Sequence, residues 1–146
     1  MSGNSHFTVA LHILTLLAKT GQDDTVITSD GIADSVRTNP VFVRRLLGLL
    51  KKGRLVSVQR GSAANWRLSR LPENISLLDV YEAVQAEPLF EMHHSTPNPS
   101  CPIGCGIQPA LQTFYAQAEA ALKQELARSN IGEVLAETLT HKPVSS

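Results

Sequence analysis

The sequence predicts a mainly α-helical protein that carries one small β-hairpin. Three observations lead to this fold class. Apolar residues recur with helical spacing in three successive segments between residues 5 and 53, and two short segments of alternating apolar and polar residues follow them. In addition, residues 36–71 hold nine of the thirteen basic residues and no carboxylate, so this formally neutral chain contains a strongly basic block.

The first element is an amphipathic helix over Ser5–Lys19, with Ser5 as its expected cap. A polar and acidic loop, Gly21–Thr25, ends it. Its apolar residues lie three or four positions apart, as they do on the buried face of a helix. They are Phe7, Ala10, Leu11, Leu14, Leu17 and Ala18.

Two further helices follow closely. Thr28 or Ser29 is expected to cap a helix that runs to about Val36. Asn39 is expected to cap the next one, because Pro40 then occupies the first helical position, where proline is tolerated. Gly53 ends this helix at a position suited to a left-handed cap. Its core-facing residues are Val43, Leu46, Leu47 and Leu50.

Two helices joined by a short turn form a helix-turn-helix, and the first helix supplies the third wall of its core. Residues 55–59 and 65–69 alternate in polarity about the turn 60–64, which predicts a hairpin. Together these elements make a winged helix-turn-helix domain. In that fold the second helix of the motif enters the major groove of DNA, and the hairpin tip lies against the backbone or minor groove.

The remaining chain divides into a loop and a long helix. Ser76 and Asp79 form an acidic capping box for a helix that packs on the first domain. A long helix is expected from about Gly106 to Arg128, with a heptad-like apolar stripe that favours a partner helix, and Ile131–Thr140 forms a short helical tail. We therefore predict a winged helix-turn-helix domain over 1–85, a connecting loop with the cysteine pair over 86–105, and a dimerisation helix with its tail over 106–146.

The basic block predicts double-stranded DNA as the partner, since Lys and Arg contacts to phosphates release condensed counterions. Arg44 or Arg45 can pair with guanine through its planar guanidinium, and Phe42 faces either a thymine methyl or the core, with the core favoured. The hairpin adds further polar groups. The residues that we expect to contact DNA are Thr38, Asn39, Val41, Arg44, Arg45, Arg60, Ser62, Asn65 and Arg67.

The two cysteines, Cys101 and Cys105, lie in the stretch "SCPIGCGI" and allow several interpretations. Cys101 at the start of the long helix would have a lowered thiol pKa, which makes it a redox candidate with Cys105 as the resolving thiol. A buried structural role for Cys101 is equally compatible. A metal site with His93 and His94 is less favoured because Cys-x3-Cys is an unusual spacing. We expect no metal and no cofactor.

Several function classes are not favoured. The chain lacks a phosphate-cradling Gly loop and a credible acid–base carboxylate pair, so we do not expect an enzyme. The apolar run Val9–Ala18 is too short to span a bilayer and has no basic segment before it. We expect a soluble cytoplasmic protein with no membrane partner, in which a small molecule or an oxidant serves as effector.

Three stretches of the sequence together form a specific pattern: "TVALHILTLLA", "SDGIADSVRTNPVFVRRLLGLLKKGRLVSVQRG" and "ISLLDVYEAV". In these stretches the chain resembles the Rrf-two family of bacterial winged-helix transcriptional regulators. The segment "LFEMHHSTPNPSCPIGCGIQ" is similar to the YwnA-like branch. The resemblance implies a homodimer that binds a palindromic operator, usually as a repressor. Members that hold an iron-sulfur cluster have three cysteines before the long helix, whereas this chain has two.

Two other functions remain open alongside a DNA-binding repressor that responds to thiol oxidation. One is a winged-helix module that binds another protein without specific DNA binding. The other is a regulator that senses a metal or an iron-sulfur cluster.

Overall fold

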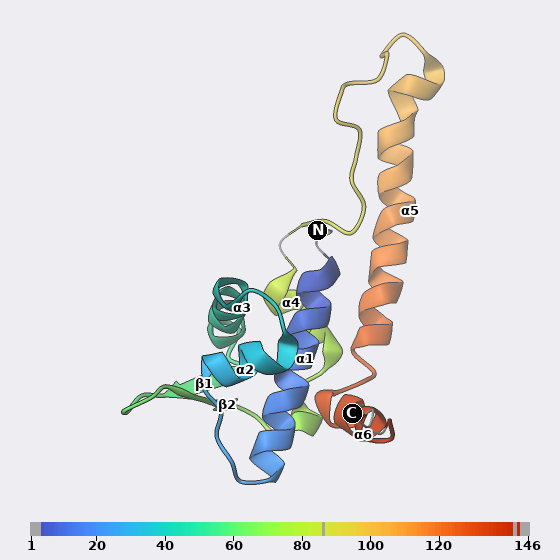
Figure 1. The fold of residues 1–146 in the computed structure, drawn as a ribbon. Helices are drawn as coiled ribbons and strands as arrows, with labels where there is room; N and C mark the ends of the chain where they lie inside the picture. The colour runs from blue at the N-terminus through green and yellow to red at the C-terminus, as the bar shows by residue number, and fades with distance from the viewer. Residues whose placement is uncertain (1–3, 86, 142, 144–146) are drawn as a thin grey trace.

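The computed structural model describes residues 4–85, 87–141 and 143. Over these residues the chain is mainly helical with one two-stranded hairpin, which confirms the predicted fold class (Figure 1). The elements are α1 Asn4–Gln22, α2 Ser29–Val36, α3 Pro40–Lys52, β1 Val56–Gln59, β2 Asn65–Leu68, the 3-10 helix η1 Pro72–Asn74, α4 Leu77–Val84, α5 Pro102–Leu126 and α6 Ile131–Leu139. Among the described helices, none is both long and apolar enough to cross a membrane.

Helix α1 lies at the centre of the core. Its residues Ala10, Ile13 and Leu14 have no exposed surface, and Leu17 is almost as buried. Helices α2, α3, α4 and α6 and strand β2 all pack against it. Burial of each large apolar side chain stabilises the folded state by about 1.5 to 3 kcal/mol. The buried face of α1 therefore contributes strongly to the stability of the domain.

Side-chain caps set the starts of four described helices, and at one of them, α6, the Asn130 side chain accepts from the Glu133 amide at 2.9 Å. The Thr28 hydroxyl accepts from the Gly31 amide at 3.1 Å, and the Asn39 side chain accepts from the Val41 amide at 2.8 Å. Ser76 and Asp79 form the predicted reciprocal capping box, with both hydrogen bonds at 3.0 Å. By contrast, Ser5 lies inside α1, which begins at Asn4, so the prediction of Ser5 as a cap was wrong.

Helix α3 does not end as the sequence suggests. Gly53 has a φ of −76°, outside the left-handed region, and Arg54 takes that conformation with a φ of 62°. A Cβ at Gly53 would lie 3.1 Å from the Cβ of Ala83. The missing side chain at Gly53 therefore lets α3 approach α4 closely.

The hairpin is antiparallel, with Ser57 opposite Arg67 and Val58 opposite Trp66. Trp66 also forms a bridge with Ile27, whose carbonyl accepts from the Trp66 amide at 2.9 Å. This bridge ties the segment before α2 to the hairpin. The hairpin is thus attached to both α1 and the helix-turn-helix motif.

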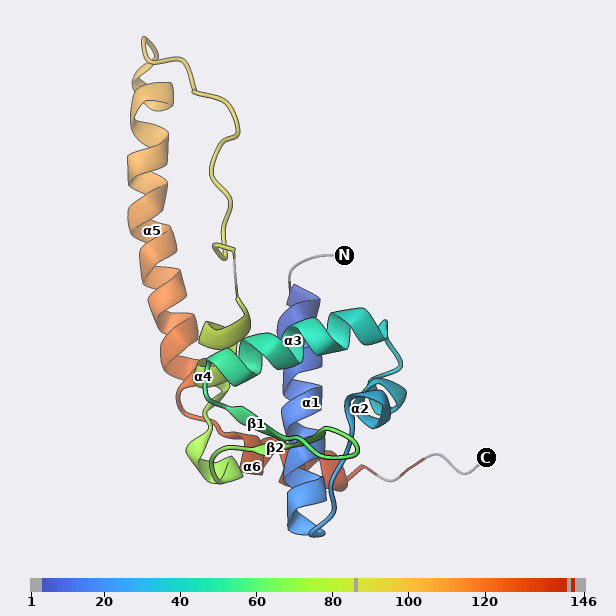
Figure 2. The same ribbon diagram turned by 90° about the vertical axis from the view of Figure 1, so that its left-hand side faces the viewer.

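The carboxyl-terminal part extends away from the first domain and then returns to it. Residues 87–101 run beside α5, where the Phe90 ring stacks on that of Tyr115 with centroids 4.5 Å apart (Figures 1 and 2). None of the residues of α5, all of which are described, is buried in the protomer.

Two features cross the predicted domain boundaries, and the three-part division remains a prediction. Helix α5 begins at Pro102 and not at Gly106, because Pro102 fits the first helical turn. Helix α6 joins the core of the first domain through Ile131 and Leu135. The Ile131 amide donates to the Ile75 carbonyl at 2.9 Å, which fixes the start of α6 on the chain before α4.

This placement of α6 predicts that Ile131→Ala lowers the free energy of unfolding by about 2 to 5 kcal/mol, the usual cost of a large-to-small change at a fully buried site. Urea denaturation measures the change. Leu139→Ala on the same helix is the matched control, since Leu139 is 54% exposed and its truncation costs less than about 0.5 kcal/mol. Equal small effects of the two variants would show that α6 is not part of the core.

Candidate nucleic-acid interface

Helix α3 and the hairpin share one side of the molecule. They lie on the left of Figure 1 and face the viewer in Figure 2, whereas α5 and α6 lie on the opposite side. Contacts of α3 with α2 and β1 hold this arrangement. One face therefore presents both the second helix of the motif and the wing.

The two faces of α3 differ as its apolar spacing predicts. The core-facing side chains are buried, and Val41 on the outer face is 65% exposed. Arg44 and Arg45 are both exposed. Phe42 is half-buried against the core, and its ring contacts that of His6 with centroids 4.9 Å apart, which agrees with the core placement favoured from the sequence. At the start of α3, Thr38 is half-buried and Asn39 is exposed.

Most of the basic side chains on this face are not neutralised within the fold. Arg44 Nη2 lies 3.9 Å from Asp30 Oδ1, but both side chains are largely solvated, so the pair is weak. Arg70 is engaged more closely, since its Nη1 lies 3.3 Å from Asp79 Oδ2 and 3.4 Å from the Asn74 carbonyl. Lys51 and Lys52, at the far end of α3, are exposed. The face keeps a surplus of positive charge.

The structure also places the predicted wing residues. Arg60 and Ser62 are exposed in the turn between β1 and β2, and Asn65 is half-buried opposite Gln59. Arg67 is exposed on β2 and borders a pocket on the side of α1. The contacts of these residues with DNA remain predictions.

One residue near this face, Arg37, was not selected from the sequence. Arg37 ends α2 in the left-handed conformation, with a φ of 56°, and its side chain is exposed in the turn of the motif. Its position in the acid-free block was the signal that could have identified it. His6 reaches the start of α3 through Phe42, a contact that only the packing of α1 against α3 reveals.

The cysteines lie at the far end of α5. Cys101 is the residue before its first turn and is half-buried, whereas Cys105 is exposed. The backbone N–H groups of Gly104 and Ile103 point toward the Cys101 sulfur, outside full hydrogen-bond geometry, and hold the pKa of this thiol below its ordinary value. Their dipoles stabilise the thiolate.

Gly104 has a packing role at this turn. A Cβ there would overlap the carbonyl oxygen of Asn98, so the start of α5 lies directly against the preceding loop. The Cys105 amide donates to the Cys101 carbonyl at 2.8 Å within the first turn of the helix. Gly104 thus lets the first turn of α5 pack against the loop before it, and it also makes that turn easier to unwind.

Comparisons with known proteins agree with this geometry. The family model "Rrf2: Iron-dependent Transcriptional regulator" matches residues 4–137. YwnA of Bacillus subtilis (strain 168), described as a candidate HTH-type transcriptional regulator, is 43% identical over 133 residues, which cover 90% of this chain and 96% of that protein.

Solved structures of other proteins share this fold. A crystal structure of a candidate DNA-binding protein is 38% identical, with a TM-score of 0.71 over 89% of this chain and 98% of the other. CymR, the global cysteine regulator of Bacillus subtilis, has a TM-score of 0.67 at 17% identity, over 94% of this chain and 96% of that one, and shows the shared fold alone.

The iron dependence in the family description does not fit the donor groups of this protomer. Iron-sulfur clusters ordinarily take four thiolates, and the chain has two cysteines. His94 is exposed, and its Nε2 lies 3.4 Å from Glu91 Oε2. Among the described residues, no three His, Cys, Asp or Glu side chains gather as metal ligands.

The lowered pKa predicts that Cys101 alkylates readily near neutral pH. In a Cys105→Ser variant, the rate of reaction with iodoacetamide reaches half its maximum at a pH below about 8.5, the ordinary value for a cysteine. In urea the backbone N–H groups no longer face the sulfur, so the midpoint rises. A midpoint that is the same in folded and unfolded protein would contradict the stabilisation of the thiolate.

Proposed function

This chain belongs to the Rrf2 family of transcriptional regulators, and from that premise we propose that it is a cytoplasmic, homodimeric repressor that binds a specific palindromic DNA sequence. Members of the family are DNA-binding regulators and not enzymes. The observation that carries the proposal is the single face that presents α3 and the hairpin with exposed, largely unneutralised arginines.

The outer face of α3 recognises the DNA sequence. Arg44 and Arg45 can each donate two hydrogen bonds to the O6 and N7 atoms of a guanine in the major groove. Thr38 and Asn39 reach a phosphate or a base edge at the start of the helix, and Val41 meets a thymine methyl. The wing residues then hold the backbone and set the register. They are Arg60, Ser62, Asn65 and Arg67.

Helix α5 supports a dimer. Its apolar side chains include Ile103, which is 72% exposed, and Phe114, which is 65% exposed. A helix of 25 residues with no buried position in its own protomer leaves a long apolar stripe in water. A second copy that packs on this stripe covers it and places two α3 helices on paired half-sites.

Cys101 supports a response to oxidants. Hydrogen peroxide oxidises its thiolate to a sulfenic acid, with loss of hydroxide, and the Cys105 thiol then condenses with the sulfenic acid to a disulfide, with loss of water. The two residues lie one helical turn apart, so the disulfide distorts the first turn of α5. The distortion changes the spacing of the two α3 helices if α5 forms the dimer.

Sequence recognition by α3 is tested with duplex DNA selected by the protein from a random pool. We expect Arg44→Ala combined with Arg45→Ala to lower the affinity ratio of selected over scrambled DNA by at least about tenfold, since each bidentate contact contributes roughly 1 to 3 kcal/mol of discrimination. Lys51→Ala, the matched control, weakens both affinities alike. An unchanged ratio in the double variant, or a pool without an enriched sequence, would refute the proposal.

The thiol response is tested by a gel shift on the selected DNA. Peroxide is expected to weaken binding by the wild type, and dithiothreitol to restore it. Cys101→Ser keeps its affinity in peroxide, whereas Ser100→Ala next to it still responds. Binding by the wild type that is indifferent to peroxide would assign both cysteines a structural role.

A further inference from the structure

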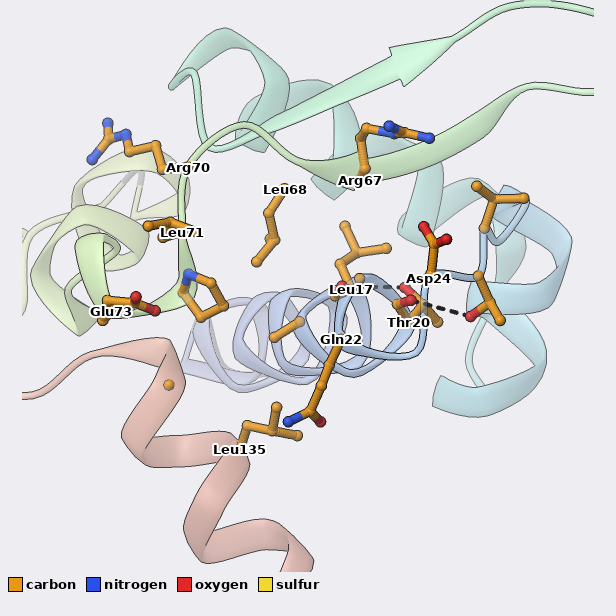
Figure 3. A pocket seen from close by; sticks show the side chains of 16 residues that line it. Leu17, Thr20, Gln22, Asp24, Arg67, Leu68, Arg70, Leu71, Glu73 and Leu135 are labelled. Carbon is orange, nitrogen blue, oxygen red and sulfur yellow. Dashed lines mark hydrogen bonds between the residues drawn. The ribbon is translucent and has the colours of Figure 1, made fainter.

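A pocket of about 560 Å³ lies between the end of α1, strand β2, the segment around η1 and helix α6 (Figure 3). Its apolar floor includes the buried side chains Leu17 and Leu135 and the half-buried Leu68. At its margin Val26 is 52% exposed and Leu71 is 61% exposed. The volume falls in the range of sites for small organic ligands. Val26 and Leu71 are left in water within the protomer.

The two ends of the pocket carry charges. Arg67 and Asp24 lie at one end, and Arg70 and Glu73 lie at the other, with the leucines between them (Figure 3). Arg70 already pairs with Asp79, which leaves Glu73 as the free charge at its end. Arg67, Asp24 and Glu73 form no salt bridge with another described residue. The pocket therefore offers one free cation, Arg67, and two free carboxylates, Asp24 and Glu73, to a ligand that carries both signs of charge.

We propose that this pocket binds a short zwitterionic peptide with apolar side chains. Its carboxylate pairs with the Arg67 guanidinium, whose planar fork suits that group. Its ammonium group lies at the Glu73 carboxylate, and its side chains cover Leu68, Leu71 and Leu135. The volume accommodates two or three residues, more than a single free amino acid would fill.

The pocket is well placed to act on the wing. Arg67 and Leu68 belong to β2, and Val26 precedes Ile27, which bridges to Trp66. A peptide carboxylate on Arg67 withdraws that guanidinium from DNA phosphates, so the bound peptide weakens DNA binding. This last effect rests on the proposed function, whereas peptide binding itself does not.

The site is tested without DNA, so that its failure is distinct from failure of the proposed function. Trileucine is titrated into the full chain by calorimetry and by the fluorescence of Trp66, the single tryptophan, which is half-buried beside Arg67. We expect saturable heat and a saturable change in Trp66 emission. N-acetyl-trileucine amide, which lacks both charges, binds at least about tenfold more weakly, the loss expected for two contacts to charged groups.

Gly21→Leu places a side chain at the pocket without disturbing the fold. Gly21 lines the pocket in the last turn of α1, and a Cβ there meets nothing within 4 Å. The variant is expected to lose trileucine binding. Gly48→Leu is the matched control on α3, where a Cβ also meets nothing within 4 Å, and it retains binding.

Three results would overturn the proposal. Wild-type protein without saturable heat up to the solubility limit of trileucine would show that no such site exists. Unchanged binding by Gly21→Leu would place the peptide elsewhere. Equal affinity for the blocked peptide would remove the role of the charged ends.

Discussion

Burial of one face of α1 is the constraint on which the rest of the structure depends. Ala10, Ile13 and Leu14 have no exposed surface, and elements from both ends of the chain pack against them. Because β2 and α3 both contact α1, that helix sets the position of the wing relative to the helix-turn-helix motif. The DNA-facing surface that we propose, although made of polar residues, is therefore positioned by an apolar stripe on its far side.

The sequence predicts the local structure well because the signals act over a few residues. The Thr28, Asn39 and Ser76 caps each satisfy an amide two or three positions further on, and the apolar spacing of α3 identifies which of its side chains are buried. The placement of α6 could not be predicted in this way. Ile131 and Leu135 show that α6 has an apolar face, but not that this face packs on α1. Likewise, the role of Gly53 depends on Ala83 in another helix.

In the candidate site too, features set by neighbouring residues could be predicted from the sequence, whereas features set by packing between separate elements could not. Exposure of Arg44 and Arg45 could be read from helical periodicity, and the low pKa of Cys101 from its place at the start of a helix. Arg67 could be assigned to the hairpin, but its second position at a pocket depends on α1, η1 and α6 meeting there. In contrast to this packed domain, α5 buries no residue in the protomer, so the dimer that we propose for it could not be inferred from packing within the protomer.

In the proposed complex, the face made by α3 and the hairpin binds DNA through its unpaired basic side chains. The most direct measurement is the affinity for duplex DNA over a range of salt concentrations. Phosphate contacts by roughly five of these side chains predict a slope of about −4.5 for the logarithm of the binding constant against that of the salt concentration. A slope near zero would contradict DNA binding by this face and would favour a winged helix that docks another protein.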